Sequence, residues 1–82
     1  MERNRRRDIV IDWISVTGST RIVAEAYDPQ TETIYVRFTN GKEWRYSNCP
    51  PHVWEEFMAP GQSRGKYIAR VLDSKPHGQL TD

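Results

Sequence analysis

The sequence predicts an α+β fold: an antiparallel β-meander of three or four strands with two short helices packed on one face. Three observations support this prediction. β-Prone segments fill the first half of the chain, an Asn40-Gly41 turn signal separates two of them, and apolar residues at helical spacing follow Pro50-Pro51. Strands followed by helices along the chain are typical of this fold class.

The chain has 82 residues, a length typical of one domain. We expect residues 1–8 to form a disordered basic arm, residues 9–76 to form the domain, and residues 77–82 to fray. A single cysteine, Cys49, excludes an intramolecular disulfide and suits a reducing compartment. No apolar run approaches a membrane span, and the stretch 8–12 that follows the Arg-rich start is too short and too acidic for a signal-peptide core. We therefore expect a cytoplasmic protein without a membrane partner.

The first half of the chain contains the predicted strands. Residues 9–16 are β-prone, residues 21–27 alternate between apolar and polar, and residues 33–39 and 42–47 flank the turn. The second of these segments is expected to place three apolar residues on one face of the sheet: Ile22, Ala24 and Ala26.

Two helical patterns follow the strands. Pro50-Pro51 suits the first turn of a helix, because the missing N–H of proline costs nothing there, and Pro60-Gly61 stops the pattern. The apolar residues between them follow helical spacing: Val53, Trp54, Phe57 and Met58. Ser63 is a suitable N-cap for a second helix that ends before Pro76. The apolar face of this second helix consists of Tyr67, Ile68, Val71 and Leu72.

The Asn40-Gly41 turn can close in two registers, which place the aromatic residues differently. A two-residue type I′ loop pairs Thr39 with Lys42. It gathers an aromatic and basic set on one face of the sheet: Tyr35, Arg37, Trp44 and Tyr46. Such a face suits base stacking, with arginine on a phosphate or over a ring.

The alternative is a three-residue loop with Gly41 in the left-handed region as a β-bulge. This loop shifts the register by one residue, so that Val36 faces Trp44 and Ile34 faces Tyr46. One face of the hairpin is then apolar throughout.

The opposite face of the bulged hairpin pairs Tyr35 with Arg45 as a cation–π contact and Arg37 with Glu43 as an ion pair. A slip of one residue moves every side chain to the other face, so burial selects the register strongly. We favour the bulged register because Trp44 is more stable buried than exposed. In this register we expect Trp44 and Tyr46 to be mainly core.

Short motifs occur in a characteristic order from Ile14 to Leu72: Ser19, Ile22, Tyr27-Asp28, Ile34-x-Val36-x-Phe38, Asn40-Gly41, Trp44-Arg45-Tyr46, Pro50, Trp54 and Ser63-x-Gly65-x-Tyr67. In this order and spacing the chain resembles the KTSC domain, a small domain at the C-terminus of some lysyl-tRNA synthetases and a stand-alone bacterial or phage protein. Trp44 stands where the aromatic-x-aromatic signature of that family usually has tyrosine. The resemblance implies no established activity. The synthetase context suggests RNA binding, but the chain contains no synthetase module and aminoacylation is not implied.

Candidate nucleic-acid-binding residues fall into three groups. Stacking residues and cations of the hairpin are Tyr35, Arg37, Trp44, Arg45 and Tyr46. At the start of the second helix, anion-binding candidates are Ser63, Arg64 and Lys66. The N-terminal arm contributes Arg5, Arg6 and Arg7 as phosphate contacts. The competing interpretation is that the aromatic residues fill the core, the arginines are solvated, and Ser63 caps a helix that Gly65 lets approach the sheet.

The sequence shows no catalytic constellation and no metal or cofactor site. Cys49, His52 and Glu56 stand near the start of the first helix, but three ligands are too few for a structural zinc, which needs four. Cys49 with His52 is also a poor candidate for nucleophilic catalysis, because nothing orients the histidine. We expect Cys49 to be a small buried residue. The stretch 61–66 is one residue short of a P-loop, and Tyr67 stands where a Ser or Thr hydroxyl is needed. We therefore expect no enzyme.

Two hypotheses about function remain. The first is a small non-catalytic domain that binds RNA, either tRNA or a single strand. The second is a protein–protein interaction module of a bacterial or phage accessory protein, with residues 9–16 as an edge that adds a strand to a partner. The net charge of +1 favours neither strongly, and the sequence does not indicate an oligomeric state.

Overall fold

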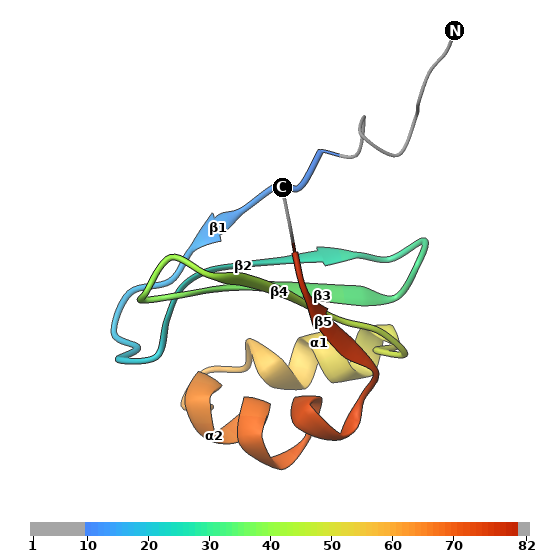
Figure 1. The fold of residues 1–82 in the computed structure, drawn as a ribbon. Coiled ribbons are helices and arrows are strands. Elements are labelled where there is room, and N and C mark those ends of the chain that lie inside the picture. The colour runs from blue at the N-terminus through green and yellow to red at the C-terminus, as the bar shows by residue number, and fades with distance from the viewer. Residues whose placement is uncertain (1–9, 81–82) are drawn as a thin grey trace, which may run out of the picture.

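Five antiparallel strands form one sheet in the order β1-β2-β3-β4-β5, and two α-helices lie on one side of it (Figure 1). The computed structural model describes residues 10–80. The strands are β1 (Ile14–Ser15), β2 (Ile22–Asp28), β3 (Thr33–Phe38), β4 (Glu43–Tyr46) and β5 (His77–Gln79). The helices are α1 (Pro51–Phe57), α2 (Arg64–Arg70) and the 3₁₀ helix η2 (Leu72–Ser74). The predicted α+β class is confirmed, with one strand more than expected.

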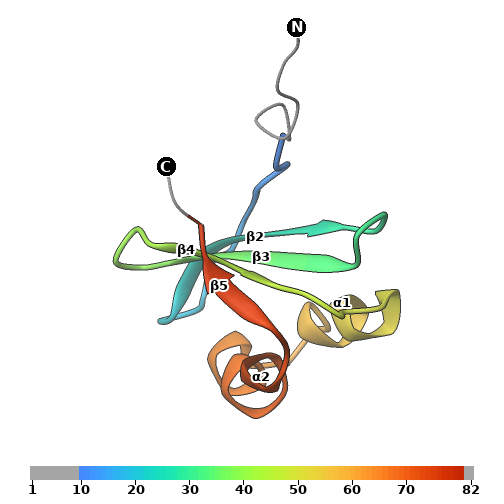
Figure 2. The same cartoon turned by 45° about the vertical axis from the view of Figure 1, so that its right-hand side comes forward.

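The first strand is shorter than predicted. Ile14 and Ser15 pair with β2, opposite Glu25 and Ala24, and the N–H of Val16 donates to the carbonyl of Val23 at 2.9 Å. The segment from Val10 to β1 lies on the side of the sheet away from the helices (Figures 1 and 2). This leaves Ile14 52% exposed, so the apolar run of the sequence is only partly used for burial.

A β-bulge in β2 overturns the prediction that Ile22, Ala24 and Ala26 share one face. Ile22 pairs with Phe38, but Ala24 pairs with Arg37, so the alternation shifts between the two. An extra residue in one strand of an antiparallel pair causes such a shift. Ile22 therefore joins the core on the helix side, while Ala24 and Ala26 lie on the outer face.

The central hairpin adopts the bulged register. Val36 pairs with Trp44 and Ile34 with Tyr46, as that register predicts. Gly41 has a φ of 90°, and its N–H donates to the carbonyl of Phe38 at 2.9 Å. Glycine suits this position because a side chain there would be strained.

Both predicted helices are confirmed, and both cover the same face of the sheet (Figure 2). α1 begins with Pro51 in its first turn, as expected for a residue that lacks an N–H. The Ser63 hydroxyl caps α2 by accepting a hydrogen bond from the N–H of Lys66 at 3.3 Å. Gly65 packs against the side chain of Arg21, which agrees with the close approach expected of it.

Residues His77–Gln79 form β5 instead of fraying. They pair with β4, opposite Tyr46, Arg45 and Trp44 in turn. The carbonyl of Pro76 and the N–H of Leu80 extend the pairing to Ser47 and Glu43. The open edge of β4 supplies the partner for this segment, and local sequence does not reveal such a partner.

The core lies between the sheet and the helices. Its buried members are Ile22, Ile34, Val36, Tyr46, Cys49, Val53, Phe57, Tyr67, Ile68 and Leu72. Cys49 is fully buried, as expected. Between residues 10 and 80, no helix has the length and apolar character needed to cross a membrane.

Candidate functional site

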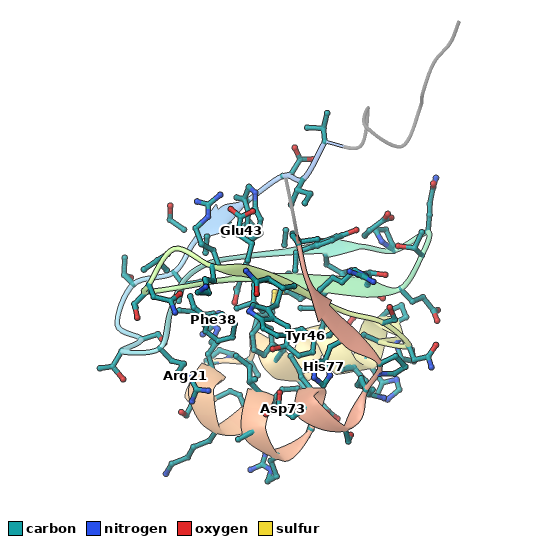
Figure 3. All side chains as sticks on the ribbon, viewed as in Figure 1. Arg21, Phe38, Glu43, Tyr46, Asp73 and His77 are labelled. Atoms are coloured by element: carbon teal, nitrogen blue, oxygen red, sulfur yellow. The ribbon has the colours of Figure 1, made fainter. Side chains whose placement is uncertain are left out.

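A groove opens on the helix side of the sheet, where the end of the hairpin meets β5 and the last helical segment. Its volume is about 600 Å³. The side chains of Phe38, Tyr46, Asp73 and His77 lie below the sheet toward the C-terminal helices, whereas Glu43 lies above it (Figure 3). The remaining lining includes Arg21, Trp44 and Ile68.

Aromatic rings from three strands wall the groove. His77 of β5 lies against Trp44 and Tyr46 of β4, with ring centroids 5.9 and 5.4 Å away. Tyr46 is only 3% exposed, which confirms that it belongs to the core. Trp44, expected to be mainly core, is only partly buried, because the helices do not extend over this end of the sheet.

Two opposite charges line the same groove. The guanidinium of Arg21 lies 5.7 Å from the centre of the Phe38 ring. Burial, aided by the negative charge of Asp73 and opposed by the positive charge of Arg21, raises the pKa of Tyr46 to about 12. Tyr46, Asp73 and Arg21 all line the groove.

The imidazole of His77 has a defined tautomer. Its Nδ1 lies 2.7 Å from the carbonyl oxygen of Lys75, which can only accept a hydrogen bond. Nδ1 therefore carries the proton, and Nε2 of the neutral ring is left as an acceptor.

The remaining hairpin candidates lie on the opposite face of the sheet. Arg37 pairs with Glu43 at 2.7 Å, as predicted, and its guanidinium stacks over Trp13 at 4.5 Å. Tyr35 and Arg45 are opposite in register. The predicted cation–π contact between these two does not occur in the described part of the chain, because the Arg45 guanidinium lies against Gly78 of β5.

The start of α2 offers only one of the two cations that the sequence suggested, because Arg64 is engaged in an ion pair. Arg64 donates two hydrogen bonds to Glu25, at 3.0 and 2.8 Å, and this occupies its guanidinium. Glu25 projects from β2 into the core and is 3% exposed. Ser63 is used as the helix cap, and Lys66 alone of the three has an exposed charge.

The predicted nucleic-acid residues thus form no single surface. Trp44 and Tyr46 line the groove, Tyr35, Arg37 and Arg45 lie on the outer face, and Ser63, Arg64 and Lys66 lie at the start of α2. The arm residues Arg5, Arg6 and Arg7 lie outside the described residues.

Sequence reasoning missed four residues that complete the groove: Arg21, Phe38, Asp73 and His77. The sequence did indicate the position of Phe38, since the favoured register places it at the end of the apolar face. No local sequence pattern places Asp73 and His77 there, because their position depends on how η2 and β5 return to the hairpin.

Cys49 and Glu56 have structural contacts. Burial raises the pKa of the Cys49 thiol. Glu56 accepts a hydrogen bond from the hydroxyl of Tyr67 at 2.8 Å. Across residues 10–80, no three metal-ligating side chains gather closely enough to hold an ion.

Comparison with known proteins identifies relatives for most of the chain. Residues 18–75 match the KTSC domain. A protein of Tsukamurella paurometabola is 34% identical over 54 residues, which cover 66% of this chain and 79% of that protein. The crystal structure of a KTSC domain protein from Yersinia pestis superposes with a TM-score of 0.78 at 20% identity, covering 88% of this chain and all of that one. The structural likeness shows the fold that the two chains share.

Proposed function

This chain belongs to the KTSC domain family, and we propose that it is a small non-catalytic domain that binds single-stranded RNA, free or exposed in a tRNA loop. The aromatic groove between the hairpin, β5 and η2 carries this proposal. Proteins bind single strands by stacking bases on aromatic side chains beside a cationic group. The groove supplies that combination.

The dimensions and walls of the groove suit a base. Its volume of about 600 Å³ falls in the range of small-ligand sites. Trp44 and Phe38 are partly buried, so each ring is held in place while part of it stays accessible. Stacking of one base on such a ring contributes roughly 1–3 kcal/mol.

Charge plays a smaller part than in most RNA-binding domains. The net charge is +1, Arg37 and Arg64 are engaged in ion pairs, and Arg21 shares the groove with Asp73. Each phosphate contact adds about 0.7 to the slope of log affinity against log salt for a single strand. We therefore expect a shallow salt dependence, with stacking as the main source of affinity.

The test is fluorescence anisotropy with labelled tRNA and short single-stranded RNA over a series of salt concentrations. We expect Trp44→Ala to weaken binding about tenfold or more, since it removes a stacking platform. Arg21→Gln should weaken binding, since it removes the cation of the groove. Lys66→Gln is the matched control, because Lys66 is exposed outside the groove and its loss should change little. Circular dichroism would verify that each variant is folded.

Affinity weaker than about 10⁻⁴ M at low salt, the limit of non-specific binding, would contradict the proposal. The protein-interaction hypothesis would then take its place. It is favoured by the edge strand β1, where Ile14 is 52% exposed. A pull-down with the whole chain, repeated with Ile14→Lys, would test it; absence of a stoichiometric partner would count against it.

A further inference from the structure

The Tyr46 hydroxyl in the groove has no hydrogen-bond partner among residues 10–80, although Tyr46 is 3% exposed. The two comparable tyrosines are satisfied internally. Tyr27 donates to the carbonyl of Cys49 at 2.7 Å, and Tyr67 donates to Glu56 at 2.8 Å. Buried polar groups in native proteins are paired with protein, water or ligand. Tyr46 lines the groove, so a polar ligand bound there would supply the partner that residues 10–80 do not.

Two charged residues that line the same groove, Arg21 and Asp73, restrict the chemistry of that ligand. Within residues 10–80, neither Arg21 nor Asp73 forms an ion pair. Arg21 offers only donors, and an ionised Asp73 offers only acceptors. A ligand that pairs with both residues must present acceptors to Arg21 and donors to Asp73. Because the walls of the groove are aromatic, a planar ring system that carries both sets fits best.

Guanine fits this description better than the other common bases. It presents O6 and N7 as adjacent acceptors, which arginine contacts with two hydrogen bonds. Its N1–H and N2 amino group are adjacent donors, which match the two oxygens of a carboxylate. Adenine, cytosine and uracil do not offer both pairs.

We infer that the groove is a guanine-selective subsite, with Arg21 on the O6/N7 edge, Asp73 on the N1/N2 edge and Tyr46 completing the hydrogen bonds. This inference rests on the proposed binding of single-stranded RNA and specifies which base the groove selects. Trp44 and Phe38 provide the stacking surfaces for the base.

The test measures the affinity of the full chain for uridine-rich oligonucleotides that differ only at one central position. That position carries guanine, adenine, cytosine, hypoxanthine (inosine, which lacks the N2 amino group) or 7-deazaguanine (which lacks N7). We expect the guanine oligomer to bind about tenfold or more tightly than the adenine and cytosine oligomers. The two modified bases should each lose much of this advantage.

Variants assign the two edges. Asp73→Asn should abolish the preference for guanine over inosine and keep the preference over 7-deazaguanine. Arg21→Gln should abolish the preference over 7-deazaguanine and keep the preference over inosine. Tyr46→Phe should weaken binding of guanine without unfolding the chain, because the hydroxyl has no internal partner. Glu55→Gln and Lys66→Gln, exposed charges outside the groove, are the matched controls.

The oligomers distinguish a failure of guanine selectivity from a failure of RNA binding itself. Equal binding of all five oligomers, still lost in Trp44→Ala, would overturn guanine selectivity and leave RNA binding intact. Absence of binding to every oligomer would overturn both. A guanine preference that survives Asp73→Asn and Arg21→Gln would overturn the assignment to this groove.

Discussion

At the scale of single residues, Tyr46 combines burial with an unsatisfied hydroxyl. Its hydroxyl makes no hydrogen bond within residues 10–80, so removing it breaks none, whereas a satisfied hydroxyl contributes about 1 kcal/mol. The aromatic ring is retained in the core beside His77. The ring therefore stabilises the fold, while the hydroxyl in its unliganded state does not.

Tyr46→Phe should consequently be as stable as the original chain, or more stable by up to about 1 kcal/mol, at neutral pH. Tyr67→Phe is the matched control and should lose about 1 kcal/mol, because the Tyr67 hydroxyl donates to Glu56. Urea denaturation of the three proteins measures the difference. A clear loss of stability in Tyr46→Phe would show that its hydroxyl has a partner in the free protein.

The dependence of stability on pH should also differ between the original chain and Tyr46→Phe. The pKa of Tyr46 is raised to about 12 in the folded chain, from an ordinary value of 10.0. The unfolded chain therefore loses this proton first, so stability present below pH 10 falls as the pH rises toward 12, by roughly 2 kcal/mol. Tyr46→Phe should reduce this alkaline loss without removing it, since the pKa values of Tyr27 and Tyr67 are raised too. Identical alkaline unfolding profiles would contradict the assignment.

At the scale of elements, the pair of Glu25 and Arg64 joins the sheet to α2 across the core boundary. Two hydrogen bonds link β2 to the first residue of the helix. Glu25 is the only charged residue that is buried among residues 10–80, and Arg64 is its counter-ion. Taking a carboxylate out of water is costly, so the pair is stable only while both members are present.

Arg64→Leu should therefore destabilise the domain by about 3–5 kcal/mol, because it leaves the Glu25 carboxylate buried and unpaired. The double variant Glu25→Leu/Arg64→Leu should recover most of this loss, since apolar replacement of a whole buried pair is often neutral. Arg70→Leu, an exposed arginine at the end of the same helix, is the control. Thermal or urea unfolding distinguishes the variants; wild-type stability in Arg64→Leu would show that the pair is not required.

At the scale of the whole molecule, β5 closes the structure around the groove. It covers the edge of β4, and its His77 supplies one wall of the groove. The chain thus returns from the helices to the sheet, and it joins the last described residues to the central hairpin (Figure 1). The fold and the groove consequently depend on the same short strand.

A chain that ends at Pro76 should be less stable than one that ends at Leu80, which keeps β5 and serves as the matched control. Truncation removes the ladder to β4 and the contacts of His77 with Trp44 and Tyr46. A loss of about 2 kcal/mol would lower the melting temperature by roughly 8–16 °C in a domain of this size. Equal melting temperatures for the two chains would indicate that residues 77–80 do not pair with β4 in solution.

The sequence by itself determined the elements whose signals are local. The Asn40-Gly41 turn and the apolar alternation around it predicted the bulged hairpin, because only that register gathers the apolar side chains on one face. Pro51 and Ser63 predicted where the helices begin, because a proline without an N–H and a capping hydroxyl act on their own first turns. The motif order between Ile14 and Leu72 predicted the family.

Only the tertiary structure decided the bulge in β2, the strand β5 and the composition of the groove. The bulge turns Glu25 into the core, where Arg64 of α2 offsets its charge. No local sequence pattern indicates that these two residues, 39 positions apart, form a pair. Residues 77–79 become a strand because β4 offers an open edge, a partner that exists only after the hairpin has folded. Arg21, Phe38, Asp73 and His77 meet because the chain returns to the hairpin, so the candidate site depends on long-range pairing that local patterns do not encode.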